Sequence, residues 1–477
     1  MKRKSFLMLT ALCMLLTGIT SCGGGSDDAV EEPTVTPTPT PTPTPDPTPS
    51  TDDTPSAVRY KTFKGLVMAG YQAWFNCVGD WTGRGWVHLN SNGGGFKPGA
   101  TCVEYWPDLT EYTKLYNTPF KMPDGTTAKM FSSADKETID LHFKWMKQYN
   151  IDGAIVQRFK SAVESNPSTK EMIGYMLEAA KKYDRAIMIE YDLSGLGKDQ
   201  DETLIINDWN ELAERYKLYD PAVNPTYVWT DGKPLVGFYA VDMEDSSKPT
   251  RYGSPEQYNR IFDALIGRDG KAGACSILAG VGYNWQTGNG DNGAGDLAQW
   301  EATLKRCSVI SPWAVGRFKD KSSFTGRYDV IKSNLEWCNK NNIIYAPVAF
   351  PGFSWHNTTT SWSNGIPTFR DDAPYDAIPR NKGDFFWTQL ACYIQWGIPS
   401  IFIAMFDEMD EGTCIFKCSH KDQTPVNSSA QNPNGKILSY DEDLPTGYYL
   451  HLAGSAAKWL KGATGYSQKR PEYVEPE

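Results

Sequence analysis

The chain has 477 residues, of which 40% are hydrophobic, 22% are charged and 13% are aromatic. This length suffices for a large buried core, and the composition is too polar for an integral membrane protein. The formal net charge of −10 argues against a general nucleic-acid binder, because such proteins carry a basic surface. The 16 Trp and 25 Tyr residues supply ring surface both for a core and for flat, polyhydroxylated ligands.

The first residues predict an export signal followed by a lipid attachment site. Lys2 to Lys4 precede an apolar run from Phe6 to Leu16, which is too short to span a bilayer comfortably. The small residues before Cys22 resemble the lipobox of Gram-negative bacterial lipoproteins, which implies cleavage before this residue and lipidation of its thiol. An ordinary signal peptide with an incidental Cys is the alternative. We therefore predict an exported outer-membrane lipoprotein, exposed at the cell surface and attached to the membrane only through its lipid.

A segment rich in proline and threonine separates this anchor from the folded region. Alternating Pro in residues 31–56 fixes φ and removes hydrogen-bond donors, so the segment forms neither helix nor sheet. We expect an extended spacer of polyproline type. The predicted organisation is a signal peptide at 1–21, a lipidated Cys with a disordered linker at 22–57, and one folded domain at 58–477.

Eight of the ten cysteines follow Cys22, and export permits disulfides without fixing their pairing. Cys414, Cys418 and His420 do not fit a zinc-ligand spacing, so a local disulfide or buried thiols are favoured there. The stretch at 288–296 is rich in Gly and Asn, and a flexible loop explains it better than a calcium site. Three other thiols lie in apolar runs typical of a core: Cys275, Cys307 and Cys392. The sequence predicts no metal site and no cofactor.

Short apolar runs alternate with amphipathic segments along the folded region. Eight runs are typical of strands buried in a parallel sheet: 63–70, 151–157, 185–191, 234–240, 274–281, 307–313, 343–349 and 399–405. Segments with helical spacing follow them at 135–149, 168–183, 201–217, from Ser254 onward, and at 294–305, 326–341, 382–396 and 446–461. The helix that begins near Ser254 has the order of a capping box, Ser254-Pro255-Glu256-Gln257, with Pro at its first position.

This strict order predicts an α/β fold, a single (β/α)₈ barrel of TIM type with long βα loops. A doubly wound open sheet is less favoured, because no glycine-rich phosphate turn follows the first strand. In such barrels the site lies at the carboxyl ends of the strands, so the residues after each run are the candidate substrate-binding groups. In chain order they are Tyr71, Trp74, His88, Arg158, Glu190, Tyr191, Asp192, Tyr283, Trp285, Arg317, Trp355, His356, Asp407 and Asp410.

Rings and carboxylates without a Ser or Cys nucleophile motif are typical of a sugar site, and a glycosidic bond needs two carboxyl groups. The segment at 407–412, Asp-Glu-Met-Asp-Glu-Gly, directly follows the last apolar run. If the chain turns helically here, Glu408 and Glu411 share a face with Cβ atoms about 5–6 Å apart. Repulsion raises one pKa, so one carboxyl can act as acid and the other as base. A solvated acidic turn is the alternative, but the preceding strand directs this segment into the barrel mouth.

The segment Glu408-Met409-Asp410-Glu411-Gly412-Thr413 resembles the E-W-H-E-G-T element of glycoside hydrolase family 99, the endo-α-mannosidases. The likeness extends over nearly all of residues 58–477. Within this group of proteins, the chain most resembles the family 71/99-like lipoproteins. Further matching motifs, in order, are Tyr71 with Trp74, Trp86-Val87-His88, Phe131-Ser132-Ser133, His142-Phe143, Ile151-Asp152-Gly153, Gln157-Arg158-Phe159, Ile189-Glu190-Tyr191 and Tyr283-Asn284-Trp285.

The resemblance implies roles for individual residues. Glu408 corresponds to the base that takes the proton from the sugar 2-hydroxyl, whose oxygen then attacks C1 to form a 1,2-anhydro sugar. Glu411 corresponds to the acid that protonates the leaving oxygen and then activates water, with net retention. Glu190 corresponds to a glutamate near the sugar subsite. The chain departs from the family at Met409 and Asp410, where the family has Trp and His, and this departure leaves the sugar open. With a substrate whose 2-hydroxyl is not placed for attack on C1, the same pair would work as a conventional nucleophile and acid.

The sequence therefore predicts a monomeric glycoside hydrolase that cleaves an α-linked oligo- or polysaccharide with retention, α-mannosides being the first candidates. Glu408 and Glu411, after the eighth strand, are its predicted catalytic residues. The alternative from another functional class is a surface lipoprotein that binds glycan in the same barrel without cleaving it. Both interpretations need the aromatic residues, and only the first needs the glutamate pair.

Overall fold

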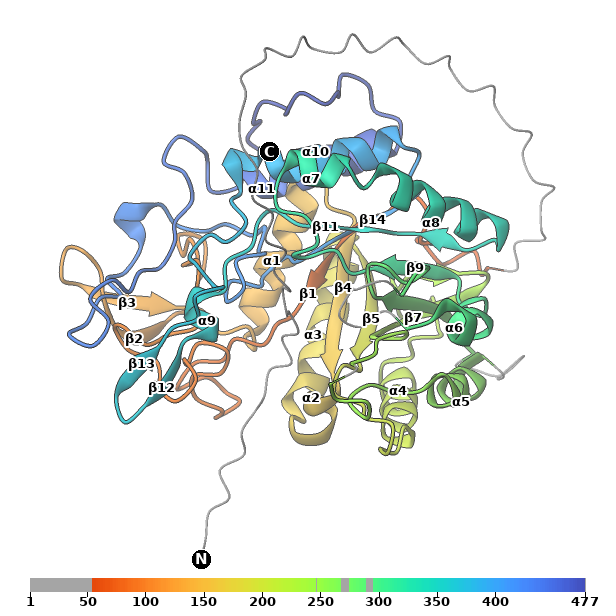
Figure 1. The fold of residues 1–477 in the computed structure, drawn as a ribbon, viewed down its shortest axis with the longest axis horizontal. Helices are drawn as coiled ribbons and strands as arrows, with labels where there is room; N and C mark the ends of the chain where they lie inside the picture. Colours follow the sequence, from red (N-terminus) through yellow and green to blue (C-terminus); the bar gives the residue numbers. More distant parts are fainter. Residues whose placement is uncertain (1–53, 246, 267–273, 289–294, 477) are drawn as a thin grey trace, which may run out of the picture. The chain divides into compact units, whose positions relative to one another are not determined.

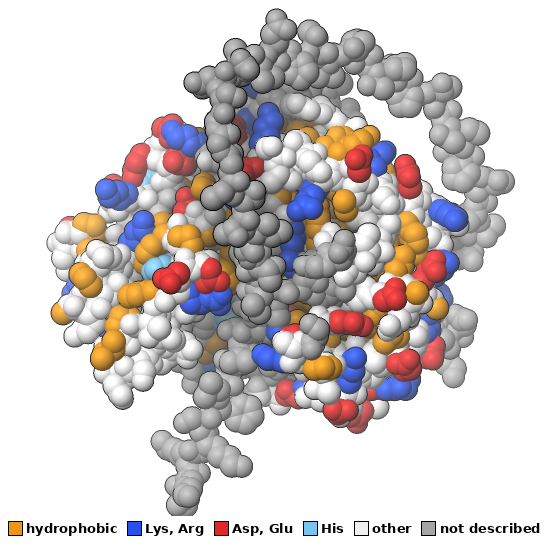
Figure 2. Space-filling model, in the orientation of Figure 1, with side chains coloured by type: hydrophobic (Ala, Val, Ile, Leu, Met, Phe, Trp, Pro, Cys, Tyr) orange, Lys and Arg blue, Asp and Glu red, His pale blue; other side chains and the backbone are white. Residues whose placement is uncertain are grey.

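The computed structural model describes residues 54–245, 247–266, 274–288 and 295–476. The predicted signal peptide, Cys22 and nearly all of the Pro/Thr linker lie outside these ranges, as does most of the glycine-rich loop at 288–296. Within the described ranges, no helix combines the length and apolarity needed to cross a membrane. On the face seen in Figure 2, acidic and basic side chains are interspersed rather than gathered into one charged surface.

A ring of parallel strands forms the centre of the molecule (Figure 1). The hydrogen-bonded order is β10-β9-β8-β7-β5-β4-β1-β14-β11. The strands are β1 (Val67–Tyr71), β4 (Gly153–Phe159), β5 (Ala186–Asp192), β7 (Lys233–Tyr239), β8 (Ser276–Val281), β9 (Val309–Pro312), β10 (Ile344–Tyr345), β11 (Val348–Ala349) and β14 (Ile401–Ile403). Every residue of β1 and β5 is buried, as expected for strands covered on both faces.

The seventh strand closes the ring by changing partner. β10 pairs with β9, whereas β11 pairs with β14, and only Ala346 and Pro347 separate these two segments. The Ala346 amide donates to the Ile310 carbonyl at 2.9 Å, and the Pro347 carbonyl accepts from the Phe402 amide at 3.1 Å. The strand order therefore returns to its starting point, and the predicted (β/α)₈ barrel is confirmed.

Helices cover the outside of the barrel, one after each strand position. They are α1 (Lys136–Gln148), α3 (Ser168–Tyr183), α4 (Thr203–Tyr216), α5 (Pro255–Ile266), α6 (Leu297–Leu304), α8 (Tyr328–Lys340), α10 (Asp384–Gln395) and α11 (Tyr448–Leu460). The predicted capping box of α5 is present, because the Gln257 amide donates to Ser254 Oγ and the Ser254 amide donates to Gln257 Oε1. All eight predicted helices are confirmed to within a few residues at their ends.

The strands also lie where the apolar runs predicted them, with shifts at their ends. The first strand begins at Val67 rather than at Phe63, because the chain turns at Gly65. Gly65 has a φ of +86°, and the Leu66 amide donates to the Phe63 carbonyl at 3.2 Å to close that turn. Phe63 remains buried in the core even though it precedes the strand.

Long loops add further elements, most of which gather on one side of the barrel in Figure 1. They are the hairpin of β2 (Tyr116–Lys121) and β3 (Thr127–Met130), α2 (Lys160–Ser165), β6 (Trp229–Thr230), α7 (Lys321–Thr325), α9 (His356–Thr359), the hairpin of β12 (Ser361–Ser363) and β13 (Ile366–Thr368), and 3₁₀ turns at Asn381–Gly383 and Lys421–Gln423. β6 pairs antiparallel with β7 outside the ring.

The loops after β1, β11 and β14 bind one another by backbone hydrogen bonds. The Trp362 amide of the β11 loop donates to the Asn92 carbonyl of the β1 loop at 2.8 Å. The Leu438 amide of the β14 loop donates to the Glu104 carbonyl of the β1 loop at 2.6 Å. These loops follow the carboxyl ends of their strands, so together they form the wall around the mouth of the barrel.

The eight cysteines beyond Cys22 are all buried free thiols in the structure. Cys275, Cys307 and Cys392 lie in the core as predicted. The sulfur atoms of Cys414 and Cys418 are 3.6 Å apart without a bond between them. His420 Nε2 bonds the Leu444 carbonyl at 2.9 Å instead of approaching these thiols, so the buried-thiol alternative describes this cluster.

Candidate active site

The acidic segment after β14 is attached to the end of β1 through Asp407. Its two carboxylate oxygens accept the backbone amides of Gln72 and Ala73, both at 2.8 Å. Burial raises the pKa of Asp407 to about 7, and the two amide bonds oppose that rise. Because both oxygens are occupied by backbone donors, Asp407 fixes the position of the segment rather than facing the mouth.

Glu408 is buried at the foot of the turn and is held at both oxygens. Oε1 accepts from Gln72 Nε2 at 2.9 Å, and Oε2 accepts from Thr413 Oγ1 at 2.6 Å. Burial, followed by the charge of Glu411, raises the pKa of Glu408 well above its usual range, while the Thr413 hydroxyl opposes the rise. The two donors favour the ionised form of this carboxyl over the neutral form.

The segment from Asp407 to Thr413 forms a tight turn instead of the helical turn considered in the sequence analysis. The Met405 amide donates to the Thr413 carbonyl at 3.1 Å, and the Cys414 amide donates to the Glu408 carbonyl at 3.2 Å. Gly412 allows the reversal with a φ of +64°, and a Cβ there would lie 3.0 Å from the Ser354 amide nitrogen. The two glutamates therefore lie on one hairpin-like turn.

Glu411 is half-buried near the tip of this turn, and its carboxylate receives no hydrogen bond from any described residue. Its backbone carbonyl accepts the Ser354 amide at 3.0 Å, which fixes the residue from the β11 loop. Burial, then the charges of Asp410 and Glu104, raise the pKa of Glu411 to about 8. This carboxyl therefore carries a proton at neutral pH, and no described residue receives that proton in a hydrogen bond.

Arg380 binds the backbone of the turn. Its Nη2 atom donates to the carbonyls of Gly412 at 2.9 Å and Cys414 at 2.7 Å. The guanidinium lies 4.5 Å from the ring centroid of Tyr105 and 4.6 Å from that of Tyr449. This cation therefore stabilises the shape of a turn that concentrates negative charge.

An aromatic stack lies beside Asp410. Trp74 stacks on His88 with centroids 3.8 Å apart at 6°, and its other neighbour Phe159 lies at 5.0 Å. His88 Nδ1 contacts Asp410 Oδ2 at 3.4 Å. The second oxygen, Asp410 Oδ1, is buried without a hydrogen-bond partner among the described residues. The structure therefore brings the predicted residues Trp74, His88 and Asp410 together next to Glu411.

Glu190 faces the interior from β5. Its Oε2 atom accepts from Gln157 Nε2 at 2.9 Å, and its Oε1 atom is buried without a partner in the described part of the chain. Burial, followed by the charge of Asp192, raises the pKa of Glu190 to about 8. Neighbouring strands make room for it, because a Cβ on Gly237 would lie 2.9 Å from Glu190 Cβ and one on Gly280 would lie 3.4 Å from its Oε1.

The next part of the wall comes from β7 and β9. Tyr239, at the end of β7, packs edge-on against Trp313 with centroids 5.5 Å apart. Arg317 is half-buried, and its positive charge acts on the Tyr239 hydroxyl. Asp192 also acts on that hydroxyl and is held by the Ser194 amide, which donates to its Oδ1 at 2.8 Å. The predicted residues Asp192 and Arg317 are therefore part of this group.

Two predicted residues point away from the mouth. Arg158 forms a buried ion pair with Asp208 of α4, with bonds of 2.5 Å and 2.6 Å. The Tyr191 hydroxyl donates to the same carboxylate at 2.8 Å. Side chains alternate along a strand, so Gln157 and Glu190 point inward while their successors point to the helices. The prediction of Arg158 and Tyr191 as substrate-binding residues was therefore wrong.

Tyr71 is also turned outward, because it precedes the inward-facing Gln72. Its hydroxyl bonds His142 Nδ1 at 2.8 Å, and Tyr112 bonds the other ring nitrogen at 2.7 Å. Burial lowers the pKa of His142 to about 3, so this ring stays neutral between two hydroxyls. Tyr71 joins β1 to α1 and does not line the mouth.

Four other predicted residues lie in packing environments. Trp285 is buried against Trp337 of α8, with centroids 4.9 Å apart, and Tyr283 is buried against Phe318. Trp355 packs beside Phe353 at 5.3 Å. His356 Nδ1 bonds the Ala373 carbonyl at 2.8 Å, and its ring lies 3.9 Å from Tyr375. None of these contacts joins them to the glutamate pair.

Glu104 is a further acid of the site and was not among the predicted residues. It is buried beneath the turn, and its carboxylate accepts from Ser354 Oγ at 2.6 Å and from the Asn357 amide. Burial raises the pKa of Glu104 to about 8 against these two bonds, and its charge acts on Glu411. The sequence does contain a sign of this residue, because Glu104 is the single acid in the otherwise apolar run from Cys102 to Trp106.

The comparisons with known proteins agree with this architecture. No protein-family model matches the sequence, and no curated protein is significantly similar to it. A solved structure of the family 99 endo-α-mannosidase from Bacteroides thetaiotaomicron is similar in structure, with a TM-score of 0.57 and 16% identity over 84% of this chain and 98% of that chain. The same enzyme in complex with bis-tris-propane gives a TM-score of 0.55 at the same identity and coverage. The chain therefore has the fold of the family 99 endo-α-mannosidases, as the sequence resemblance predicted.

Proposed function

We propose that this protein is a glycoside hydrolase that cleaves an α-linked glycan with retention of configuration. The observation that carries the proposal is the contrast between two carboxyls on one turn at the barrel mouth. The pKa values of both carboxyls are raised, but Glu408 accepts two hydrogen bonds, whereas Glu411 accepts none from the described residues. A glycosidase needs one ionised and one protonated carboxyl, and these different surroundings favour that division.

Glu408 is the proposed base and Glu411 the proposed acid. Because the two carboxyls interact, the pair holds a proton at neutral pH, and that proton titrates as a property of the pair. The bonds from Gln72 and Thr413 favour negative charge on Glu408, which leaves the proton on Glu411. Glu411 is also the more exposed of the two, so its proton is accessible to a leaving group.

The proposed reaction has two steps. In the first, Glu408 takes the proton of the sugar 2-hydroxyl, and the 2-oxygen forms a bond to C1. The bond from C1 to the leaving oxygen breaks, and that oxygen departs with the proton of Glu411. In the second, Glu411 takes a proton from water, the water oxygen bonds C1 as the C1–O2 bond of the anhydro sugar breaks, and the 2-oxygen regains a proton from Glu408. Two inversions at C1 give net retention, and both carboxyls return to their initial state.

The surrounding residues are suited to an uncharged sugar. Tyr239 supplies ring surface, while Glu190 and Asp410 each have a buried carboxylate oxygen without a partner in the described part of the chain. Sugar hydroxyls would satisfy these oxygens, since a hydroxyl is both donor and acceptor. We propose α-mannosides as the first substrates to test, because a solved structure with this fold is that of an endo-α-mannosidase.

The test is digestion of a panel of α-linked oligosaccharides and polysaccharides, with NMR of the first anomer released. We expect Glu411→Gln to abolish hydrolysis and to retain binding, because the amide keeps the shape but has no acidic proton. Glu214→Gln, at an exposed carboxylate on α4, is the matched control and should retain full activity. Full activity of Glu411→Gln would refute the assignment. Binding without cleavage by the wild type would favour the non-catalytic glycan-binding alternative.

We also propose that the enzyme acts at the surface of a Gram-negative cell as a lipoprotein attached through Cys22. The support is the sequence around that residue, which lies outside the described residues. Metabolic labelling with a fatty acid in a Gram-negative host tests it. Label should enter the wild type and the Cys13→Ala control and should be lost from Cys22→Ala. Equal labelling of the two cysteine variants would contradict the proposal.

A further inference from the structure

Trp81 has an unusual position among the tryptophans of the chain. All 16 lie in the described ranges, and Trp81 alone is exposed, with 46% of its surface accessible. It belongs to the long loop after β1, but it contacts the outer helices rather than the barrel mouth. Its ring centroid lies 6.4 Å from that of Tyr175 on α3, in an edge-on arrangement.

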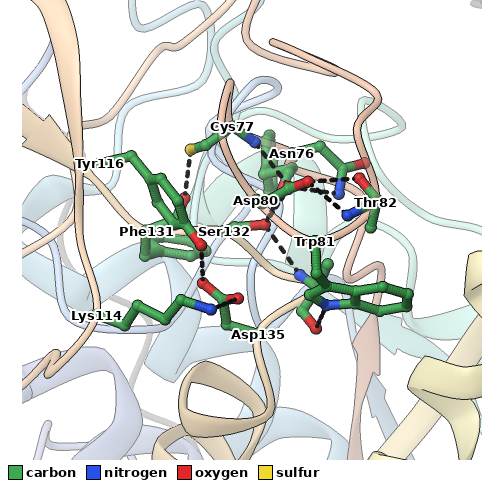
Figure 3. Close-up of polar contacts among 12 residues, drawn as sticks. Asn76, Cys77, Asp80, Trp81, Thr82, Lys114, Tyr116, Phe131, Ser132 and Asp135 are labelled. Atoms are coloured by element: carbon green, nitrogen blue, oxygen red, sulfur yellow. Dashed lines mark hydrogen bonds and ion pairs between the residues drawn. The ribbon is translucent and has the colours of Figure 1, made fainter.

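The loop that carries Trp81 is rigidly organised by Asp80 (Figure 3). The Asp80 carboxylate accepts the Cys77 amide at 3.0 Å and the Ser132 hydroxyl at 2.7 Å. It also accepts the amide and hydroxyl of Thr82, at 3.0 Å and 2.6 Å, and the side-chain amide of Asn76. Five bonds to one carboxylate hold the residues on both sides of Trp81 in a single conformation.

The indole itself is also tied down. Trp81 Nε1 donates to the Ala134 carbonyl at 2.8 Å, just before α1 begins. The start of α1 is in turn held to the β2 hairpin, because Asp135 accepts from Lys114 Nζ at 2.5 Å and from the Tyr116 hydroxyl at 2.9 Å (Figure 3). The polar edge of the ring is thus satisfied by the protein, and the exposed part is its apolar carbon surface.

A groove of about 280 Å³ lies between α1 and α3. Tyr175 belongs both to the groove and to the contact with Trp81. The charged residues that line it are paired across the two helices, Lys136 with Glu178 and Lys182 with Asp140. The groove is therefore rich in donors and acceptors but has no excess of either charge.

From this arrangement we infer a second carbohydrate-binding site, on the outer helical layer, formed by Trp81, Tyr175 and the groove between α1 and α3. An exposed, fixed ring matches the C–H face of a pyranose, and the balanced polar groove matches its hydroxyls. A charged ligand would find no net attraction there, and a protein partner would need a larger apolar surface than one ring. The ligand is therefore an uncharged glycan chain.

Pre-organisation explains how so small a surface binds a ligand. The loop and the ring are already ordered, so binding does not incur the entropy loss of immobilising them. A polymer held at this site has its other residues at a high effective concentration around the barrel mouth. The site acts by retention of polymers and adds nothing to the cleavage of short substrates.

Affinity electrophoresis in native gels tests the site, with yeast α-mannan, dextran and glycogen as the dissolved probes. The parent protein for this test is Glu411→Gln, so that the polymers stay intact. We expect at least one polymer to retard the parent, and Trp81→Ala to weaken that retardation about tenfold, because the ring contact with the sugar is lost. Trp81→Phe should restore part of it, and Tyr328→Ala, at an exposed ring on α8, should leave it unchanged.

Retardation of the parent by none of the three polymers, or equal retardation of Trp81→Ala, would overturn the inference. Sedimentation velocity tests whether a second copy of the chain, rather than a glycan, occupies the site. Self-association of the parent that is lost in Trp81→Ala would also overturn the inference. The outcome is separable from that of the proposed function. Trp81-dependent retardation without any hydrolysis by the wild type would support this site and refute the enzymatic proposal alone.

Discussion

Gln72 Nε2 donates a hydrogen bond of 2.9 Å to Glu408 Oε1, although the two residues are 336 positions apart in the sequence. Gln72 follows the first barrel strand and Glu408 follows the last, and these strands are neighbours because the barrel is closed. Closure therefore supplies the donor that favours charge on the proposed base. The second donor, Thr413, comes from the same turn as Glu408 and needs no closure.

Removal of these donors is expected to shift the pH profile of hydrolysis. Both donors stabilise ionised Glu408, so Gln72→Leu or Thr413→Val raises its pKa and protonates more of the base at a given pH. The acid limb of the profile of kcat/KM should then move to higher pH by about one unit, since a hydrogen bond to a charged group contributes about 1.5–3 kcal/mol. Thr446→Val is the control, because it removes a similar 2.8 Å bond to Asp108 outside the pair. Profiles that coincide with the wild type in both variants would contradict this role.

Loss of Arg158 is expected to reduce stability without changing substrate binding. Arg158→Met leaves the buried Asp208 carboxylate without its guanidinium, which should lower the free energy of unfolding by about 3–5 kcal/mol. Urea unfolding measures this loss, and KM measured below the melting temperature should stay at the wild-type value. Arg158→Met combined with Asp208→Leu should recover part of the stability. A raised KM of Arg158→Met with unchanged stability would instead indicate that Arg158 binds substrate.

A single methyl group on β7 is expected to displace Glu190. In Gly237→Ala the new Cβ would lie 2.9 Å from both Cβ and Cγ of Glu190, closer than such atoms can approach. The Glu190 side chain must leave its present position, which disturbs its hydrogen bond with Gln157, and we expect KM to rise roughly tenfold, as for the loss of a hydrogen bond. Gly326→Ala, whose nearest neighbour is 3.4 Å away, should leave KM unchanged. Wild-type kinetics for Gly237→Ala would exclude Glu190 from substrate binding.

The buried carboxyls are expected to make the protein less stable as pH rises. Burial raises the pKa of Glu104 to about 8, whereas an unfolded glutamate titrates near 4.3. Between these values the folded state holds a proton that the unfolded state has lost, so folding becomes less favourable with increasing pH. The melting temperature should therefore fall between about pH 5 and pH 8, and Glu104→Gln should reduce this fall. A melting temperature that rises over this interval would contradict the assignment.

The order of the fold was predictable because each element has a local signature. Apolar runs of strand length alternate with helical spacing, and the residue types at Ser254 and Gln257 suffice to mark the start of α5. The pairing of the strands was also implied, since a strict alternation of strands and helices is compatible with few topologies. The change of partner at Pro347 had no local signature, because it depends on the curvature of the whole sheet.

The inward and outward faces of the strands could not be assigned from the sequence. A strand buried on both faces is apolar throughout, so alternation gives no information about which side chain enters the barrel. Gln157 and Arg158 are both polar residues at the end of β4, and only the structure places the first inside and the second against α4. The glutamate pair was predicted because it lies in a turn, where four acids in five residues need an explanation.

The wall of the mouth also constrains how such a protein changes its ligand over time. Loops from three different strands share backbone hydrogen bonds, among them the bond between Trp362 and Asn92 and the bond between Leu438 and Glu104. Replacement of one loop would leave buried amides and carbonyls of the others without partners, and each such loss is costly. New specificity in this lineage should therefore arise either through side-chain exchange on an unchanged backbone or through joint replacement of interlocked segments, and grafting of a single foreign loop should yield insoluble protein.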